Sequence, residues 1–436
     1  MNTSTQASNA PRSAGLREGE HADNYFGHDR AELRSLLPHT TRRLLDVGCG
    51  SGTLGAVFKS EAAGRYAAGV EGFPDAAANA RRRLDAVYEV DLNTFTGLPP
   101  EAGQFDAMTF GDVLEHLNDP ERTLAALLPS LAPGGVIAIS VPNINHWSVV
   151  CPLSIMDAFT YEDAGLLDRT HVNFFTLDSV SAMFDRLGLR AITVGMTKPV
   201  ELPTEATPFV HRIAAATGDA YEAVARATAY QYLVSATLDG PAPTPVAAPV
   251  APRIATPGLD ALVPPGKRVV RVAADAPPGL PLDHRVLADI EGADDSWPRA
   301  FVLDSVLGHT RSPERVLEAL AETMGDDDVA VLGVRNVRYW GILAPLLLHD
   351  EWLYTAGELA DHPQRLFTAA SLRGHIADAG LEVVAWEDDS VPMPPENDAL
   401  LTALRGYANV DEDDARTAFE RRWMRVLVRT TAGAGA

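Results

Sequence analysis

The sequence predicts a two-domain α/β protein whose first domain is a doubly wound, mostly parallel sheet. Three observations lead to this prediction. Short apolar runs alternate with helix-like segments over the first 240 residues, a glycine-rich turn follows the first of these runs, and acids close the next ones. A stretch rich in proline and alanine, residues 240–266, then separates this unit from a second half.

These boundaries divide the chain into four parts. We expect residues 1–22 to form a disordered arm, 23–239 the first domain, 240–266 a semi-extended linker and 267–431 a second domain. With 436 residues in the chain, each domain is long enough to bury a sizeable core.

Composition restricts the partners. The formal net charge of −23 lacks the basic field that attracts phosphate backbones, so we expect no nucleic acid as partner. The two cysteines, Cys49 and Cys151, imply no disulfide framework and fit a reducing compartment. Without an apolar run of the length that spans a bilayer, we expect no membrane partner and a cytoplasmic location.

The elements of the first domain follow from the apolar pattern and from the proline and glycine residues between its segments. Strands are predicted over 44–47, 66–71, 86–92, 105–112, 136–141, 191–194 and 230–236. Helices are predicted over 29–37, 53–58, 74–84, 120–131, 177–187 and 217–227. Residues 142–176 mix aromatics, acids and histidines, and we expect them to form a cap over the strand ends.

The second half resembles the first. When residues 105–149 are aligned without a gap on 298–342, 14 of 45 positions are identical, including His116 with His309. The same order of rare residues is not expected from a shared alanine and leucine bias, so we infer an internal duplication.

The second half lacks the features that would bind a nucleotide. Its first strand, in 268–275, is followed by no glycine turn, and the acid-ended second strand is missing. A counterpart of the third strand is predicted over 284–290. We therefore expect a scaffolding, dimerising or substrate-shaping role, with a homodimer through this domain as one form.

Acids and glycines of the first half point to one crevice. Asp46, Glu71 and Asp91 end or follow three successive strands, whose carboxyl ends face the same edge of a doubly wound sheet. A carboxylate after the second strand is well placed to accept the hydroxyls of a ribose, and Asp91 with Leu92 to contact an adenine. Gly48, Gly50 and Gly52 let a ligand approach the backbone.

The glycine spacing separates two ligand classes. Dinucleotide sites carry G-x-G-x-x-G, whereas the glycines at 48, 50 and 52 alternate. This segment resembles the first motif of class I S-adenosylmethionine-dependent methyltransferases, and residues 105–120 are similar to the fourth-strand segment of the ubiquinone-biosynthesis type. The block from Leu131 to Asn143 and the segment 168–176 also resemble this family, the latter its glycan and natural-product members. The resemblance covers most of residues 25–237.

What the resemblance implies is a Rossmann-like fold and S-adenosylmethionine as cofactor, with S-adenosylhomocysteine as product. The residues that it implies for the cofactor site are Tyr25, Asp46, Gly48, Cys49, Gly50, Glu71, Gly72, Asp91, Leu92, Gly111 and Asp112. Cys49 itself is expected to be a small filler of the loop. No metal ligand set is predicted.

Methyl transfer to an alcohol or phenol benefits from a general base, most often histidine. The candidates are His146 and His171, with Asp168 as an orienting partner. We interpret His116 as structural, because the second half keeps its counterpart His309.

The sequence therefore indicates a methyltransferase that acts on a small-molecule or glycan acceptor, with oxygen of a sugar or secondary metabolite favoured over nitrogen. Two other classes stay open at this point. One is a nicotinamide-dependent oxidoreductase, and the other is a non-catalytic scaffold of two methyltransferase-like folds.

Overall fold

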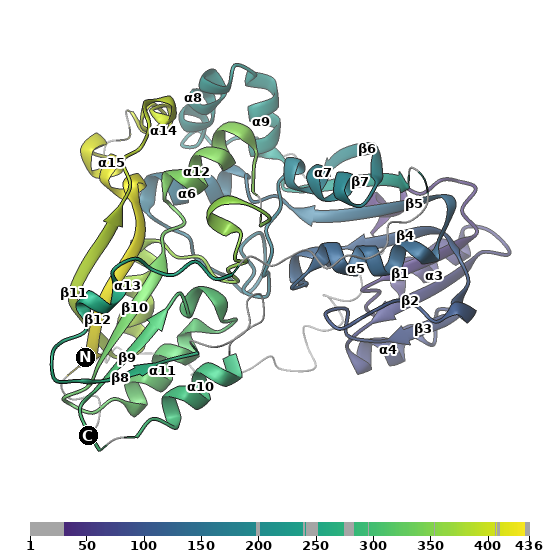
Figure 1. The fold of residues 1–436 in the computed structure, drawn as a ribbon. Coiled ribbons are helices and arrows are strands. Elements are labelled where there is room, and N and C mark those ends of the chain that lie inside the picture. The colour runs from purple at the N-terminus through teal and green to yellow at the C-terminus, as the bar shows by residue number, and fades with distance from the viewer. Residues whose placement is uncertain are drawn as a thin grey trace, which may run out of the picture.

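The computed structural model describes residues 30–197, 201–238, 240, 252–273, 283–294, 296–352, 354–405, 407 and 410–431. Within these ranges the chain forms two sheets, and helices of both halves pack together between them (Figure 1). No described helix is long and apolar enough to cross a membrane. The arm predicted for residues 1–22 lies outside the described residues.

The first sheet has seven strands in the order β3-β2-β1-β4-β5-β7-β6. These strands are β1 (Arg43–Val47), β2 (Tyr66–Glu71), β3 (Ala86–Glu89), β4 (Phe105–Gly111), β5 (Leu131–Pro142), β6 (Leu189–Thr197) and β7 (Gln231–Leu238). Strands β1 to β5 are parallel, and β7 runs antiparallel to β5 and β6. The predicted doubly wound, mostly parallel sheet is confirmed.

Helices cover both faces of this sheet. They are α2 (Ala31–Arg34), α3 (Thr53–Ser60), α4 (Pro74–Ala80), α5 (Pro120–Leu127), α6 (Trp147–Met156), α7 (Leu177–Arg186), α8 (Thr207–Thr217) and α9 (Ala220–Thr228), with short helices η1 (Pro100–Ala102), η2 (Leu114–His116) and η3 (Leu128–Ser130). Leu124 of α5 and Val180 of α7 are buried in one core, and Leu33 and Phe58 in a core on the α2 and α3 side.

Capping residues explain where two of these helices begin. The side chain of Asp119 accepts a hydrogen bond from the Arg122 N–H, just before Pro120 at the first position of α5. Thr176 and Ser179 form a reciprocal capping box at the start of α7. The predicted helices over 74–84 and 120–131 end earlier, at Ala80 and Leu127.

The second sheet has five strands in the order β11-β12-β10-β9-β8. They are β8 (Arg268–Arg271), β9 (Arg299–Asp304), β10 (Val329–Arg335), β11 (Leu381–Ser390) and β12 (Arg421–Thr430). Parallel pairs join β8, β9 and β10, and β12 is antiparallel to both β10 and β11. This order matches β1, β4, β5, β7 and β6, without counterparts of β2 and β3 among the described residues. The internal duplication stays a hypothesis, and the shared strand order of the two sheets agrees with it.

The helices of the second half lie over this sheet and along the first domain (Figure 1). They are α10 (Asp283–Glu291), α11 (Pro313–Thr323), α12 (Trp340–Ala344), α13 (Ala369–Asp378), α14 (Ala399–Leu404) and α15 (Glu412–Glu420), with short helices η4 (Leu259–Leu262), η5 (Leu307–His309), η6 (Pro345–His349), η7 (Gly357–Leu359) and η8 (Pro395–Asn397).

One prediction about the second half is wrong. The strand predicted over 284–290 is the helix α10, in which Val286 and Ile290, about one helical turn apart, both face the core. The linker predicted over 240–266 stays a prediction, and its described residues 252–266 pack on the second sheet. Leu259 packs with Val302 on one face of the second sheet, and Thr256 N–H donates to Asp304 Oδ1 at 2.8 Å.

A shared apolar core joins the two halves. Side chains of α6 and α8 pack in one cluster with side chains of α12, η6 and α14. The helix α6 belongs to the predicted cap, and it escaped prediction as a helix because it is apolar on nearly every side and shows no amphipathic period. The cap over the first sheet is therefore also the surface on which the second half lies.

Candidate functional site

The glycine turn follows β1 and opens α3. Gly48, Gly50 and Gly52 all have positive φ, of 68°, 54° and 79°. A Cβ on Gly48 would lie 2.5 Å from Val113 Cγ2, so this position needs glycine for space as well as for its backbone angle. The turn leaves bare backbone at the carboxyl end of a central strand.

Glu71 closes β2 beside this turn and is buried. One carboxylate oxygen accepts a hydrogen bond from Gly50 N–H at 2.8 Å and the other from Phe73 N–H at 2.9 Å. These bonds fix the carboxylate against the glycine turn. The adjacent Gly72 is exposed, and its backbone lies next to that of Val90.

Asp46 is the acid of β1, and it is buried. Thr109 Oγ1 donates to its Oδ1 at 2.8 Å. Burial raises the pKa of Asp46 to about 7, while the Thr109 hydrogen bond and the charge of Arg30 act in the opposite direction. Cys49 points its sulfur toward Gly69 in the core, so only its backbone is available at the turn.

Asp91 and Leu92 follow β3. Asp91 is exposed and accepts from Asn93 N–H at 2.9 Å, whereas Leu92 is buried below it. The Leu92 carbonyl accepts hydrogen bonds from Thr123 and Arg122 of α5. The sequence-predicted pair is therefore a carboxylate open to solvent beside an apolar side chain.

Gly111 and Asp112 end β4. Asp112 has the left-handed φ of 55°, and its carboxylate accepts from Ser140 Oγ at 2.7 Å and Gln231 Nε2 at 3.0 Å and pairs with Arg30. The predicted ligand contact of Asp112 has to compete with these three partners. Tyr25 lies outside the described residues.

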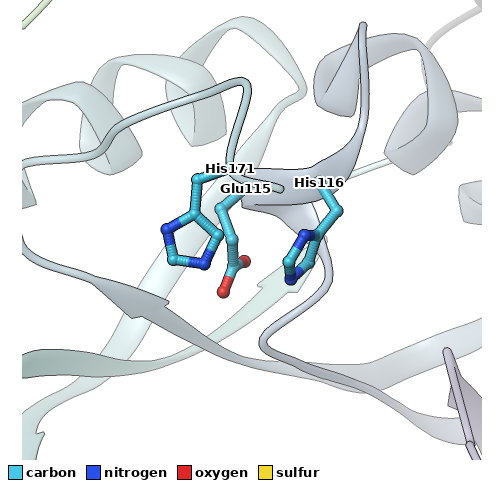
Figure 2. Close-up of side chains that lie close together, drawn as sticks. All are labelled: Glu115, His116 and His171. Atoms are coloured by element: carbon cyan, nitrogen blue, oxygen red, sulfur yellow. The ribbon is translucent and has the colours of Figure 1, made fainter. Parts of the chain in front are cut away.

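Glu115, His116 and His171 form a cluster beyond the end of β4 (Figure 2). Each of the three offers one atom that could bind a metal ion, a ring nitrogen or a carboxylate oxygen, and these atoms lie within 4.8 Å of one another. Glu115 and His116 belong to η2, and His171 reaches them from the cap. Backbone hydrogen bonds from Val172 and Asn173 to the Glu115 carbonyl hold the two segments together, at 2.8 and 3.0 Å.

Glu115 is unusual because it is 1% exposed and neither carboxylate oxygen has a hydrogen-bond partner within the described residues. Burial raises its pKa well above the ordinary value, and the charge of Asp112 acts in the same direction. A buried carboxyl without partners destabilises a protein by several kcal/mol at most sites, so such a group is retained where it has a use.

The hydrogen bonds of the two histidines fix their tautomers. His116 Nδ1 lies 3.3 Å from the Thr170 carbonyl oxygen, and His171 Nδ1 lies 3.1 Å from the Leu166 carbonyl oxygen. A carbonyl can only accept, so both Nδ1 atoms carry hydrogen and both lone pairs are on Nε2. Burial lowers the pKa of both rings, that of His171 to about 4, so both are neutral at pH 7.

Asp168 does not orient His171 as predicted. Its Oδ1 accepts from the Thr170 hydroxyl at 2.6 Å and from Thr170 N–H at 2.7 Å, whereas the Leu166 carbonyl orients His171. Because the Thr170 hydroxyl lies 3.2 Å from His116 Nδ1, Asp168 acts instead on the other histidine.

His146 stands apart from the cluster. It caps α6, with its Nδ1 3.3 Å from Ser148 N, and its ring lies against Trp147 and Tyr230. Burial lowers its pKa to about 4. Its Nδ1 is thus occupied by the helix cap, and a base role would fall to the buried Nε2.

Sequence reasoning missed Glu115 and interpreted His116 as structural. One signal was available. The ungapped alignment of the halves keeps His116 as His309 but replaces Glu115 by Gly308, so the loss in the second half falls on the carboxylate. The prediction that the chain holds no metal stays a prediction. Two imidazoles and a carboxylate are a common ligand set for a transition metal, which is a reason to test it.

Comparisons with known proteins agree with this architecture. Residues 20–194 match the family described as a methyltransferase domain. The ubiquinone biosynthesis O-methyltransferase of Psychrobacter cryohalolentis is 30% identical over 164 residues, which are 34% of this chain and 62% of that protein. The protein of the same name from Xanthomonas campestris is 36% identical over 130 residues, 28% of this chain and 52% of that protein.

The chain thus spans about half to two thirds of the length of these curated relatives. Among solved structures, a SAM-dependent methyltransferase from Archaeoglobus fulgidus is 19% identical, with a TM-score of 0.34 over 49% of this chain and 96% of that chain.

Proposed function

We propose that this chain, whose first half is a class I S-adenosylmethionine-dependent methyltransferase domain, transfers the methyl group to a hydroxyl oxygen of a small acceptor. The observation that carries the proposal is the buried Glu115 beyond the end of β4, which lies beside two neutral histidines and has no hydrogen-bond partner within the described residues. A group of proton acceptors at this place is what O-methylation needs.

The residues of the crevice fit the cofactor. The backbone of Gly48 and Gly50 would hold its methionine end, Glu71 its ribose hydroxyls, and Asp91 with Leu92 its adenine. Each Glu71 oxygen accepts one hydrogen bond from the chain and keeps a lone pair for a hydroxyl. When bound, S-adenosylmethionine supplies an electrophilic methyl carbon.

The chain then has to orient the acceptor and remove its proton. His171 Nε2 carries a lone pair and is placed by the Leu166 carbonyl, so it accepts the hydroxyl proton. Glu115 stabilises the imidazolium that results. The cap keeps water away from the cluster, which strengthens both interactions.

We place the acceptor among sugars, glycans and secondary metabolites. The net charge of −23 and the buried, capped position of the cluster favour a small, uncharged molecule over a macromolecule. Methylation of nitrogen is the alternative within this activity. A scaffold without catalysis is the alternative outside it, and the retained Glu115 speaks against it.

Calorimetric titration and a methyl-transfer assay test the proposal. The chain should bind S-adenosylmethionine and not NAD, and Glu71→Ala should abolish the heat of binding. With methyl-labelled cofactor and a panel of catechols, glycosides and amines, labelled product should form from a hydroxyl acceptor. His171→Ala and Glu115→Gln should lower kcat by about 100-fold or more while cofactor binding persists.

Two results would contradict the proposal. Binding of NAD in place of S-adenosylmethionine would exclude the activity, and an unchanged kcat in both cluster variants would exclude the site. A chelator added to the assay decides the role of the cluster. Activity that persists identifies a proton acceptor, and activity that is lost and restored by a divalent metal identifies ligands.

A further inference from the structure

We infer that Arg365 of the second half is a positioning residue for methyl transfer, because it holds in place the cap segment that carries His171. The inference rests on the proposed function. It assigns the second half a substrate-shaping role, one of the three that its sequence left open.

Arg365 lies 194 and 196 positions from the two residues of the segment that it holds, and it is 7% exposed. Its guanidinium donates to the backbone carbonyl of His171 at 3.2 Å and to that of Arg169. It also lies over the ring of Tyr161, 4.9 Å from the centroid. Two carbonyls on either side of Thr170 are thus fixed by one planar side chain, an arrangement that lysine cannot reproduce.

Neighbouring contacts repeat the same connection. Arg311 Nη2 and Gln364 Nε2 both reach Asn118 Oδ1, at 2.7 and 3.4 Å, and Asn118 follows η2 by two residues. Tyr354 accepts from Phe174 N–H at 3.3 Å. Side chains of the second half therefore contact both segments that carry the cluster.

The contact of Arg365 with this segment has a catalytic consequence. The Leu166 carbonyl that orients His171 and the Thr170 groups that orient His116 belong to the same short segment, residues 166–171. If this segment shifts, both rings shift against Glu115. Displacement of a reacting group by about 1 Å can cost on the order of 100-fold in rate.

The experiment compares Arg365→Gln and Arg365→Lys with a matched control, Arg338→Lys. Arg338 is also a buried arginine of the second half, and it donates to Ser154 O at 2.6 Å, away from the cluster. We expect Arg365→Gln to lower kcat on the order of 10- to 100-fold, with unchanged calorimetric affinity for S-adenosylmethionine. Arg338→Lys should leave kcat close to the wild-type value.

Two further measurements separate positioning from stability. Hydrogen exchange at the amides of Val172 and Asn173, which donate to Glu115, should accelerate in Arg365→Gln and not in Arg338→Lys. In a His171→Ala background, Arg365→Gln should lower kcat no further, because it acts through that histidine.

Several outcomes would overturn the inference. One is hydrogen exchange at Val172 and Asn173 that is unchanged in Arg365→Gln. Another is an equal loss of kcat in Arg365→Gln and Arg338→Lys. The third is a loss of kcat from Arg365→Gln that is as large in the His171→Ala background as in the wild-type chain. If Arg365→Gln fails to fold, Arg365→Lys takes its place in each comparison. Should the wild-type chain methylate no acceptor, the proposed function fails, and exchange in the presence of S-adenosylhomocysteine still decides whether Arg365 holds the segment.

Discussion

Asp157 of the first half and Asp350 of the second make the same contact in opposite directions. Both are left-handed residues that end a helix, with φ of 55° and 61°. Asp157 accepts from Ala370 N–H at the start of α13, and Asp350 from Asp178 N–H at the start of α7. Each backbone carbonyl also accepts a threonine hydroxyl, from Thr368 and Thr176. The two halves therefore meet in a reciprocal manner, as partners in a two-fold dimer do.

This relationship predicts that Asp157→Ala and Asp350→Ala each destabilise the whole chain. Each change removes the acceptor of a helix-start N–H and one partner of a buried side chain, Arg338 for Asp157 and Asn145 for Asp350. We expect each to cost about 1–3 kcal/mol. Because one apolar core joins the halves, urea unfolding should show one shared transition that moves to lower urea. Two separate transitions in the wild-type chain would contradict this interpretation.

The burial of Asp46 predicts a pH dependence of stability. Folding raises the pKa of this carboxyl from 3.8 to about 7, so the folded chain binds the proton more tightly than the unfolded one. The stabilisation is fully present below about pH 4, is lost progressively as the pH rises from 4 to 7, and is absent above 7. We expect Asp46→Asn to have the higher melting temperature at pH 8, by about 5 °C, and a smaller advantage at pH 5. Melting curves without cofactor measure this, and a constant difference across the pH range would contradict it.

The geometry of the glycine turn predicts that a substitution there lowers cofactor affinity in addition to stability. Gly48→Ala places a Cβ against Val113 and on a left-handed backbone, and we expect affinity for S-adenosylmethionine to fall on the order of tenfold. Gly64→Ala is the matched control. Its φ is 78°, yet nothing lies within 4 Å of its Cβ. Both variants should lose about 1–2 kcal/mol of stability through the left-handed backbone, and Gly48→Ala should lose more because its Cβ also meets Val113. Only Gly48→Ala should bind the cofactor more weakly in calorimetry.

Glu115 predicts an opposition between stability and activity. Replacing this buried carboxyl by leucine removes a polar group that has no hydrogen-bond partner among the described residues, so Glu115→Leu should stabilise the chain by about 1–3 kcal/mol. The same change should abolish methyl transfer. Chemical denaturation and the labelled-methyl assay on one preparation check both parts. A variant that is destabilised and still active would show that the cluster is structural.

Much of the first domain could be predicted, because its strands are short apolar runs that end at Val47, Glu71 and Gly111, and their spacing identifies a parallel sheet. The helix α10 could not, since the apolar side chains of a short segment at positions 286, 287 and 290 fit either period. The helix α6 was equally ambiguous, because it is apolar on nearly every side.

The sequence by itself determined the fold class of the first domain and which acids and glycines lie at its strand ends. Glycine spacing and acids at strand ends are local features, and a parallel sheet brings strand ends together without further information. Only the tertiary structure placed Glu115 between His116 and His171 and set Arg365 over the segment that orients them. These contacts join residues up to 196 positions apart, and their geometry depends on how the two halves pack, which no local pattern encodes.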